Sequence, residues 1–461
     1  MKKYFNFLLS FISSKFASLL FIYILYNFHD DSTWKSYSLY LINVSLFRNI
    51  TLSFTSNLGH EGLLSKTNKN YVKLFSSILF VVFSLQTIGL IIYFFVGEND
   101  VFIYSYLFAV ISSFQGIVQN FQRFSLKYND YSKSTLLFSF GNLIVVGVFF
   151  FNDLNTYLVS LILISLILFL IYFKLFVKII RSFEISFFVD NIKKLSISSI
   201  KLYLINTFPD SLFLVYVPLF FSSLFSDVDY AALVFLISLF GIKTYPIITL
   251  SIQKNMDLIK KYHFQKNHFL NQFLNFVNVE SKVILLISLS FLLFEIFYIT
   301  FFAKPLMIII PFFGFILWIL PLVFLRHFVN SIIEVKKDLK YKIPSFIFSV
   351  FLLIIMYFFD KVDIFNIVIV YFLNLIHLTL RHIKSKLLTF TDFFIFYKNY
   401  FIIGFLFHLN YLINLSDLII PSQIHIYLFF SVLILLITIF VYKKLILNQL
   451  TKKNFLKRNF L

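Results

Sequence analysis

The chain has 461 residues, of which 60% are hydrophobic and only 13% are charged. Soluble globular proteins have about 25% charged residues, so the composition excludes that class. The formal net charge of +19 is divided among short basic clusters that lie between apolar stretches. Because a nucleic-acid-binding protein needs a continuous basic face, the pattern predicts a polytopic all-α membrane protein and no nucleic-acid partner.

The sequence contains no Cys, which excludes disulfides and metal sites with thiolate ligands. Its nine His residues are scattered and it has no glycine-rich phosphate loop, so we expect no metal, no cofactor and no ATP hydrolysis. The first stretch, "MKKYFNFLLSFISSKF", has a basic start without a small-x-small cleavage site. It therefore predicts a retained first membrane helix rather than a removed signal peptide.

A helix needs about 20 mostly apolar residues to cross a membrane. By this criterion the sequence predicts about 14 spanning helices, with about 12 as the alternative count. They lie near 5–27, 36–57, 73–96, 101–120, 134–152, 155–177, 197–222, 229–250, 280–302, 305–331, 344–359, 363–380, 399–414 and 424–442. We expect a six-helix bundle over 1–196, a second six-helix bundle over 197–390, and a C-terminal helix pair with a basic tail over 391–461.

Successive connections between these stretches alternate in charge. One set is rich in Lys and Arg and includes the C-terminal tail. The other set is short and acidic, with Asp30, Asp31, Glu98, Asp100, Asp153, Asp227, Asp229, Asp360, Asp363 and Asp417. An excess of Lys and Arg marks the cytoplasmic side, which predicts that both termini are cytoplasmic. The longest basic connections, 178–196 and 251–279, are amphipathic and are predicted to lie at the membrane surface.

Arg48 lies near the middle of the second predicted helix. Insertion of Arg at that depth costs about 3 kcal/mol, so the residue needs a reason to be there. Helical spacing puts Ser45, Arg48, Thr51 and Thr55 on one face. This polar stripe favours the wall of a hydrated cavity. The alternative is a structural ion pair with an acidic residue of another helix.

Four further charged residues inside predicted spans are candidates for the same site. Lys15 in the first helix is placed either in a cavity or at the membrane interface, and Lys243 precedes the helix-breaking Pro246 among apolar neighbours. Asp210 ends a polar stripe in the seventh helix, and Glu295 lies in the ninth. Both acids are interpreted as ion-coupling groups or as ion-pair partners of the cations. Arg326 and His327, by contrast, are expected to be solvated near the end of their helix.

Three stretches resemble the polysaccharide-exporter branch of the multidrug/oligosaccharidyl-lipid/polysaccharide (MOP) superfamily, especially the O-antigen and capsule flippases. They are "SYSLYLINVSLFRNITLSFTSNLGHEGLL" (36–64), "QRFSLKYNDYSKSTLLFSFGNLIVVGVFFF" (122–151) and "LFSDVDYAALVFLISLFG" (224–241). In the last stretch Asp229 stands where the family usually has Gly. The number of helices and the short connections fit the same family along the whole chain.

The resemblance implies a transporter and not an enzyme. Such a protein carries a polyprenyl-diphosphate-linked oligosaccharide from the cytoplasmic to the external leaflet of the bacterial cytoplasmic membrane, by alternating access. The resemblance places Lys15, Arg48, Asp210 and Lys243 in a central cationic cavity. Arg48, Lys15 and Lys243 would then bind the diphosphate, with H⁺ or Na⁺ as the coupling ion. Glycosyltransferases and a glycan polymerase of the same pathway are the protein partners that it implies.

Two other functions remain compatible with the sequence. A multidrug or cation exporter of the same superfamily needs acidic residues to dominate the cavity, whereas cations outnumber acids here. A membrane glycosyltransferase or O-antigen polymerase usually has a long external loop. The first acidic connection, "NFHDDSTW", is short, which favours the transporter.

Overall fold

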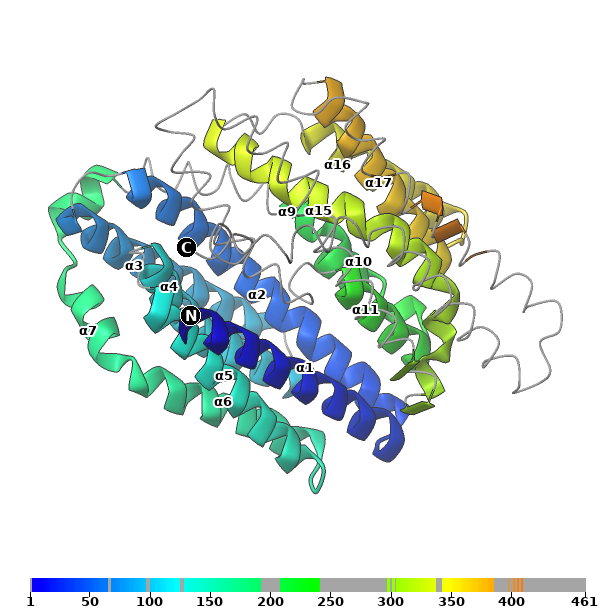
Figure 1. The fold of residues 1–461 in the computed structure, drawn as a ribbon, viewed down its shortest axis with the longest axis horizontal. Helices are drawn as coiled ribbons and strands as arrows, with labels where there is room; N and C mark the ends of the chain where they lie inside the picture. The colour runs from blue at the N-terminus through cyan, green and yellow to red at the C-terminus, as the bar shows by residue number, and fades with distance from the viewer. Residues whose placement is uncertain are drawn as a thin grey trace, which may run out of the picture. The chain divides into compact units, whose positions relative to one another are not determined.

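The computed structural model describes residues 2–64, 68–96, 100–124, 128–191, 208–240, 304–336 and 342–384. It also describes residues 297, 298, 301, 302, 397, 401, 402, 404, 405 and 408. All regular elements in these ranges are helical (Figure 1). The chain divides into two compact units, Met1–Val234 and Phe235–Leu461. The predicted boundaries at 196/197 and 390/391 lie outside the described residues and stay predictions.

Six long helices form most of the first unit. Each overlaps one of the first six predicted spans, and most of them extend beyond the predicted span at one or both ends. They are α1 (Lys2–Phe28), α2 (Asp31–Leu64), α3 (Asn68–Val96), α4 (Asp100–Phe124), α5 (Tyr128–Phe149) and α6 (Leu154–Ile171). In the described ranges, four helices of the chain are long and apolar enough to cross a membrane. On α6 the exposed face is apolar, with Leu163, Ile167 and Leu170 more than half exposed. The predicted class, a polytopic all-α membrane protein, is confirmed.

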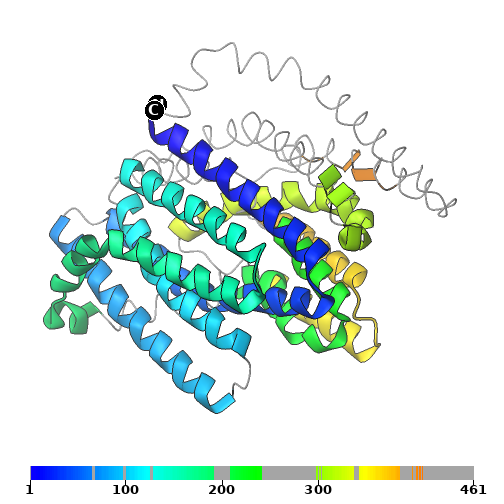
Figure 2. The same ribbon diagram turned by 90° about the horizontal axis from the view of Figure 1, so that it is seen from below.

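Helices of the first unit pack in pairs, α1 along α5 and α2 along α4 (Figure 2). Between α1 and α5, the hydroxyls of Ser10 and Ser139 lie 2.8 Å apart and the rings of Phe21 and Phe149 stack at 4.9 Å. Between α2 and α4, Phe47 makes edge contacts with Phe102 and Tyr106, each at 5.4 Å between ring centroids. Side chains from neighbouring helices therefore fill the interior of this unit.

Short acidic turns join α1 to α2 and α5 to α6. Asp30 accepts a hydrogen bond from the backbone N–H of Thr33 at 3.1 Å, and Asp153 caps α6 by accepting from the N–H of Thr156 at 2.9 Å. Hydrogen bonds lower the pKa of Asp30, with the largest effect from Thr33 and a smaller one from Ser32. Those from Thr156 likewise lower the pKa of Asp153. Both carboxylates therefore stay charged and hold the first turn of their helix.

The sixth predicted span, 155–177, ends earlier than expected. The helix stops at Ile171, and Tyr172, with φ −97° and ψ 7°, separates it from α7 (Phe173–Arg181). The hydropathy pattern misses this break because apolar residues continue on both sides of it.

The seventh predicted span is irregular where it is described. It consists of α9 (Phe208–Ser211), a π-helical turn η2 (Leu212–Tyr216), α10 (Val217–Phe220) and a 3₁₀ turn η3 (Ser222–Leu224). The N–H of Val217 bonds to the carbonyl of Leu212, five residues earlier. Pro218 follows directly and has no N–H to continue the α-helical pattern, which explains why the wider turn forms here. α11 (Asp227–Phe240) then starts the eighth span.

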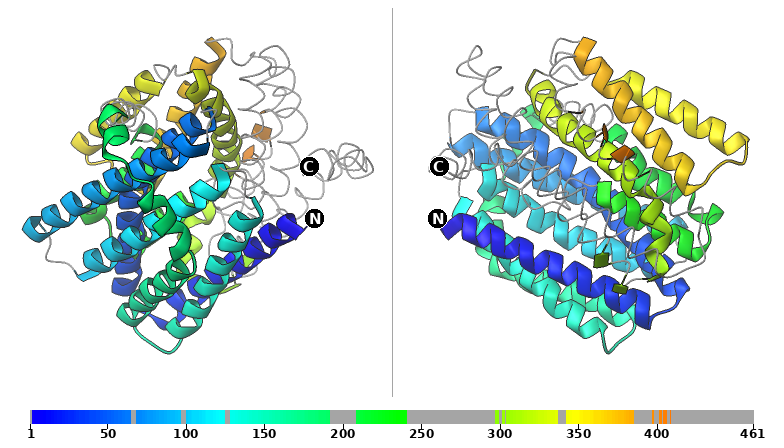
Figure 3. Two further views of the ribbon diagram at one scale, coloured as in Figure 1. Left: turned by 90° about the vertical axis from the view of Figure 1, so that its left-hand side faces the viewer. Right: turned by 45° about the vertical axis from the view of Figure 1, so that its right-hand side comes forward.

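In the second unit, α15 (Phe313–Lys336), α16 (Lys342–Phe358) and α17 (Ile364–Lys384) follow the predicted spans, and α17 packs on both others. Figure 3 shows α16 and α17 as an antiparallel hairpin. The predicted helix 305–331 begins differently, as the 3₁₀ segment η6 (Lys304–Phe312). Arg326 is 8% exposed, so the expectation that it is solvated is wrong: its side chain is covered by protein. The side chain of His327 lies outside what the structure describes.

The thirteenth predicted span packs against α15 through the few residues of it that are described. The indole N–H of Trp318 donates to the carbonyl of Phe401 at 3.0 Å, and their rings stack at 5.3 Å. A Cβ on Gly404 would overlap the Trp318 indole and lie 3.0 Å from the carbonyl oxygen of Gly314. Glycine is therefore required at 404 for this close approach.

We predict that Gly404→Ala lowers the free energy of unfolding by about 1–3 kcal/mol, as overpacking does elsewhere. Gly147→Ala is the matched control, because a Cβ there meets no atom within 4 Å. The control should leave the thermal midpoint of the detergent-purified protein unchanged or slightly raised. Equal midpoints for the two variants would contradict the close packing at Gly404.

Candidate functional site

Arg48 is partly buried on α2. It lies about 25 Å along the helix from Asp31, at a rise of about 1.5 Å per residue. Its neighbour Phe47 points at α4, so Arg48 lies on an adjacent face of α2. Among the residues that the structure describes, no carboxylate lies within 4.0 Å of the guanidinium. The ordinary explanation for a charge at this depth, a structural ion pair, thus has no support in this part of the chain.

Tyrosines lie on the same helix and across from it. Tyr37 and Tyr157, on α2 and α6, are joined by a hydrogen bond between their hydroxyls. Tyr40 lies two turns before Arg48 on α2. The Tyr40 hydroxyl is buried and makes no hydrogen bond to any described residue. We call Tyr37, Tyr40 and Tyr157 the tyrosine cluster.

Phe21 and Phe149 extend the tyrosine cluster toward α1 and α5. The ring of Phe21 lies 4.3 Å from that of Tyr37 and 4.8 Å from that of Tyr157. Phe149 also lies 4.8 Å from Tyr157. Tightly packed rings fix the positions of the hydroxyls. A guanidinium and phenol hydroxyls are hydrogen-bond donors, and together they suit an anionic or polyhydroxylated ligand.

The other predicted site residues are placed less completely. Lys15 lies on α1 and Asp210 lies on α9, but their side chains lie outside what the structure describes. Lys243 and Glu295 lie outside the described residues altogether. α2 packs against η2, the turn that follows α9 directly. The helix that carries Arg48 thus contacts the turn that follows Asp210 in the chain. The assignment of these five residues to one site stays a prediction.

A contact that the sequence does not predict joins α2 to the seventh and eighth spans. Ile42, Val215, Tyr230 and Val234 are all at most 5% exposed and form one apolar cluster. We call these four residues the apolar contact. Leu39, Leu46, Leu214, Leu219 and Phe225 pack around it.

An ion pair lies beyond the apolar contact. Lys35 Nζ is 2.9 Å from Asp227 Oδ1, and both side chains are partly exposed. Along α2 the order is Lys35, Ile42, Arg48, so the apolar contact lies between Arg48 and this end of the helix.

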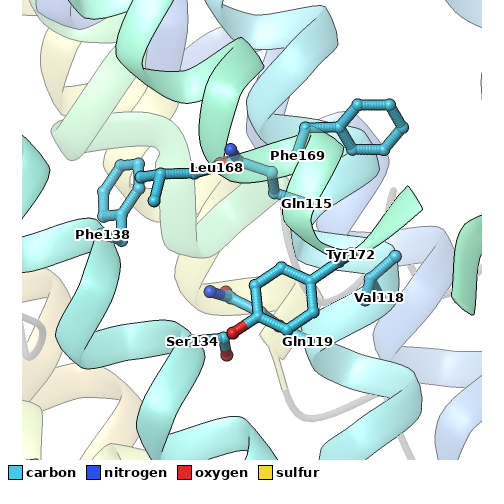
Figure 4. Close-up of a pocket in the computed structure, with 8 residues that line it drawn as sticks. All are labelled: Gln115, Val118, Gln119, Ser134, Phe138, Leu168, Phe169 and Tyr172. Atoms are coloured by element: carbon cyan, nitrogen blue, oxygen red, sulfur yellow. The ribbon is translucent and has the colours of Figure 1, made fainter. Parts of the chain in front are cut away.

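A small pocket lies between α4, α5 and α6 (Figure 4). Gln115, Gln119, Ser134 and Tyr172 give it polar groups, and Phe138 and Leu168 are among its apolar lining residues. Its empty space is about 300 Å³, and the Gln115 side chain donates to the carbonyl of Ser165 on α6. The described residues contain no cluster of metal-ligating side chains. The pocket is too small for an oligosaccharide, and Arg48 is not among the residues that line it.

No protein-family model matches the sequence, and no curated protein matches it. Solved structures do match the fold. A MATE protein crystallised with MaL6 superposes with a TM-score of 0.52 at 13% identity, over 82% of this chain and 95% of that one. A MOP superfamily transporter from Pyrococcus furiosus, described as having a binding pocket of reversed polarity, gives 0.49 at 11% identity, over 86% and 95%. The chain therefore has the fold of a MATE transporter.

We predict that reversing one charge of the Lys35–Asp227 pair loosens the apolar contact. Because the native chain has no Cys, Val234→Cys gives a single thiol at a position that is 5% exposed. In this background, Lys35→Asp or Asp227→Lys should raise the rate of labelling by a polar maleimide about two- to fivefold, the effect of an exposed ion pair worth about 0.2–1 kcal/mol.

The double exchange Lys35→Asp with Asp227→Lys should restore slow labelling. Asp190→Lys, at an exposed residue of the first unit far along the chain, is the control and should have no effect. Identical rates in all variants would show that the ion pair does not hold the contact closed.

Proposed function

We propose that the chain is a membrane transporter that moves a polyprenyl-diphosphate-linked oligosaccharide across the bilayer, with Arg48 as a ligand of the diphosphate. The observation that carries the proposal is the position of Arg48: deep along α2 and partly buried, with no carboxylate partner among the described residues. A cation kept at such depth needs a compensating anion, and a transported diphosphate supplies one.

The tyrosine cluster supports this ligand class. Phenol hydroxyls hydrogen-bond phosphate and sugar oxygens, and that of Tyr40, two turns from Arg48 on α2, is buried without a partner among the described residues. In the proposal, Lys15 and Lys243 add positive charge to the same cavity, and Asp210 or Glu295 binds the coupling H⁺ or Na⁺. The polyprenyl chain stays in the lipid. The fold, which is that of a MATE transporter, suits alternating access.

The proposed orientation puts both termini in the cytoplasm of a bacterial cell. The reason is that the termini and the Lys- and Arg-rich connections lie on the same side of the membrane in the predicted topology. The Lys35–Asp227 pair is then at the external end of α2. The apolar contact closes that end, and release of the substrate outside requires it to open. Glycosyltransferases that build the oligosaccharide and a polymerase that uses it are the protein partners of this function.

A multidrug or cation exporter is the second candidate, because the likeness to a MATE protein fits it equally well. The two candidates differ in the charge of the ligand. Arg48 attracts an anion and repels a cation, which is the reason for preferring the flippase.

We predict that Arg48→Ala abolishes export while the protein still inserts, since Ala makes α2 more apolar. Arg48→Lys should keep part of the activity, because a point cation attracts phosphate without the planar fork. Lys133→Ala, at an exposed Lys of α5, is the control and should keep full activity. The measurement is surface glycan normalised to membrane-inserted protein.

Double variants separate a ligand from a structural cation. If Arg48 pairs with an acid instead, Arg48→Ala combined with Asp210→Asn or Glu295→Gln should restore protein level and export. Rescue by either neutral partner would overturn the diphosphate role.

Deletion of the gene should leave the complete lipid-linked oligosaccharide on the cytoplasmic leaflet and remove the surface polymer. Leaflet assignment by an impermeant sugar-oxidising or lectin probe, together with mass analysis of the lipid, checks this. A lipid-linked unit that lacks one sugar would identify a glycosyltransferase. Normal surface glycan with greater drug sensitivity would identify the exporter.

A further inference from the structure

The helix α7 presents three different faces. Lys174, Lys178 and Arg181 are exposed and follow i, i+4, i+7 spacing, which places them in one row. Ile179 is fully buried on the protein side, and Phe173 and Ile180 are 46% and 41% exposed on the face between. A basic row beside an exposed apolar row is the pattern of a helix that lies in a membrane interface.

α7 is held firmly against the first unit. The ring of Phe176 lies 4.8 Å from that of Phe169 on α6 and 5.6 Å from that of Phe114 on α4. After α7, Glu184 forms an ion pair with Lys73 of α3, and the hydrogen bond from Lys73 lowers the pKa of Glu184. The basic row is therefore positioned by packing and does not need to be ordered by its ligand.

The place of α7 in the fold brings this row to the level of lipid headgroups. It follows α6 after one residue, and the last turns of α6 have the exposed apolar residues Leu170 and Ile171. Beyond α7 the exposed apolar surface continues with Ile185 and Val189, at 71% and 61%. The lipid-facing surface of the bundle thus ends at the helix where the basic row begins.

The basic row is not neutralised by the protein. α7 contains no acidic residue, and no described carboxylate forms an ion pair with Lys174, Lys178 or Arg181. The nearest acid along the chain, Glu184, is already paired with Lys73. Three unpaired cations in a row at headgroup level are complementary to anionic phospholipids.

We propose that α7 is a binding surface for anionic phospholipid headgroups, which Lys174, Lys178 and Arg181 contact while Phe173 and Ile180 enter the adjoining acyl region. This inference rests on the membrane class of the protein and is independent of the proposed substrate. The favoured ligand is a headgroup phosphate with net negative charge, such as phosphatidylglycerol, over the zwitterionic phosphatidylcholine.

The test uses the full-length protein purified in detergent and titrated with phosphatidylglycerol or phosphatidylcholine, with retained lipid counted by native mass spectrometry. Wild-type protein should retain phosphatidylglycerol preferentially. Lys174→Gln, Lys178→Gln and Arg181→Gln together should weaken its apparent affinity by more than about tenfold, since each cation near an anionic surface contributes about fivefold. Lys174→Arg with Lys178→Arg should keep the preference.

Controls make each outcome decisive. Lys361→Gln removes an exposed cation from the α16–α17 turn and should not alter lipid retention. The thermal midpoint of the triple variant in phosphatidylcholine should equal that of the wild type, because its side chains lie on the exposed face. Equal retention of the two lipids by the wild type, or an unchanged preference in the triple variant, would overturn the proposal. Displacement of the phosphatidylglycerol by millimolar inorganic pyrophosphate would overturn it as well, in favour of a site for soluble phosphate.

Discussion

Backbone hydrogen bonding in hydrocarbon is the constraint on which this fold depends. A lipid environment offers no partner for an N–H or a carbonyl, so each spanning segment satisfies its own groups as a helix. Side-chain hydroxyls obey the same rule. Ser84 donates to the carbonyl of Phe80 at 3.0 Å, and Thr87 donates to that of Phe83 at 2.9 Å. Polar residues can therefore lie on exposed helix faces without an unpaired donor.

The same constraint explains where irregular backbone is found. The π turn η2 is covered by protein, with Phe213 and Val215 at most 2% exposed. Non-helical backbone at membrane depth is tolerated when it is buried in protein. π turns are frequent at functional sites, and this one packs against α2, the helix that carries Arg48. The irregular element thus packs against the helix that carries Arg48, a cation without a carboxylate partner among the described residues.

Three kinds of positive charge have different surroundings in this unit. Lys35 is paired with Asp227 near a helix end, where the pair contributes little energy but favours one arrangement of the helices. Arg48 is deep and has no carboxylate within 4.0 Å among the described residues. The cations of α7 are exposed beside apolar residues. Their chemistry is similar, and their surroundings decide which of them suits a partner helix, a transported anion or a membrane surface.

The sequence by itself determined the membrane class, the first six spans and the depth of Arg48. These follow from the length and order of apolar residues along one segment, which are local properties. The break at Tyr172 and the π turn before Pro218 were not predicted in place, because apolar residues continue through both.

Only the tertiary structure decided which residues meet. Lys35 and Asp227 are far apart in the chain, so the sequence offered Asp227 only as part of an acidic turn. The burial of Arg326 depends on which side chains pack over it, and the spacing of residues along α15 does not reveal them. The absence of a described carboxylate beside Arg48 likewise depends on neighbouring helices. Hydrophobic length is encoded segment by segment, whereas the partner of a charge is set by contacts between segments.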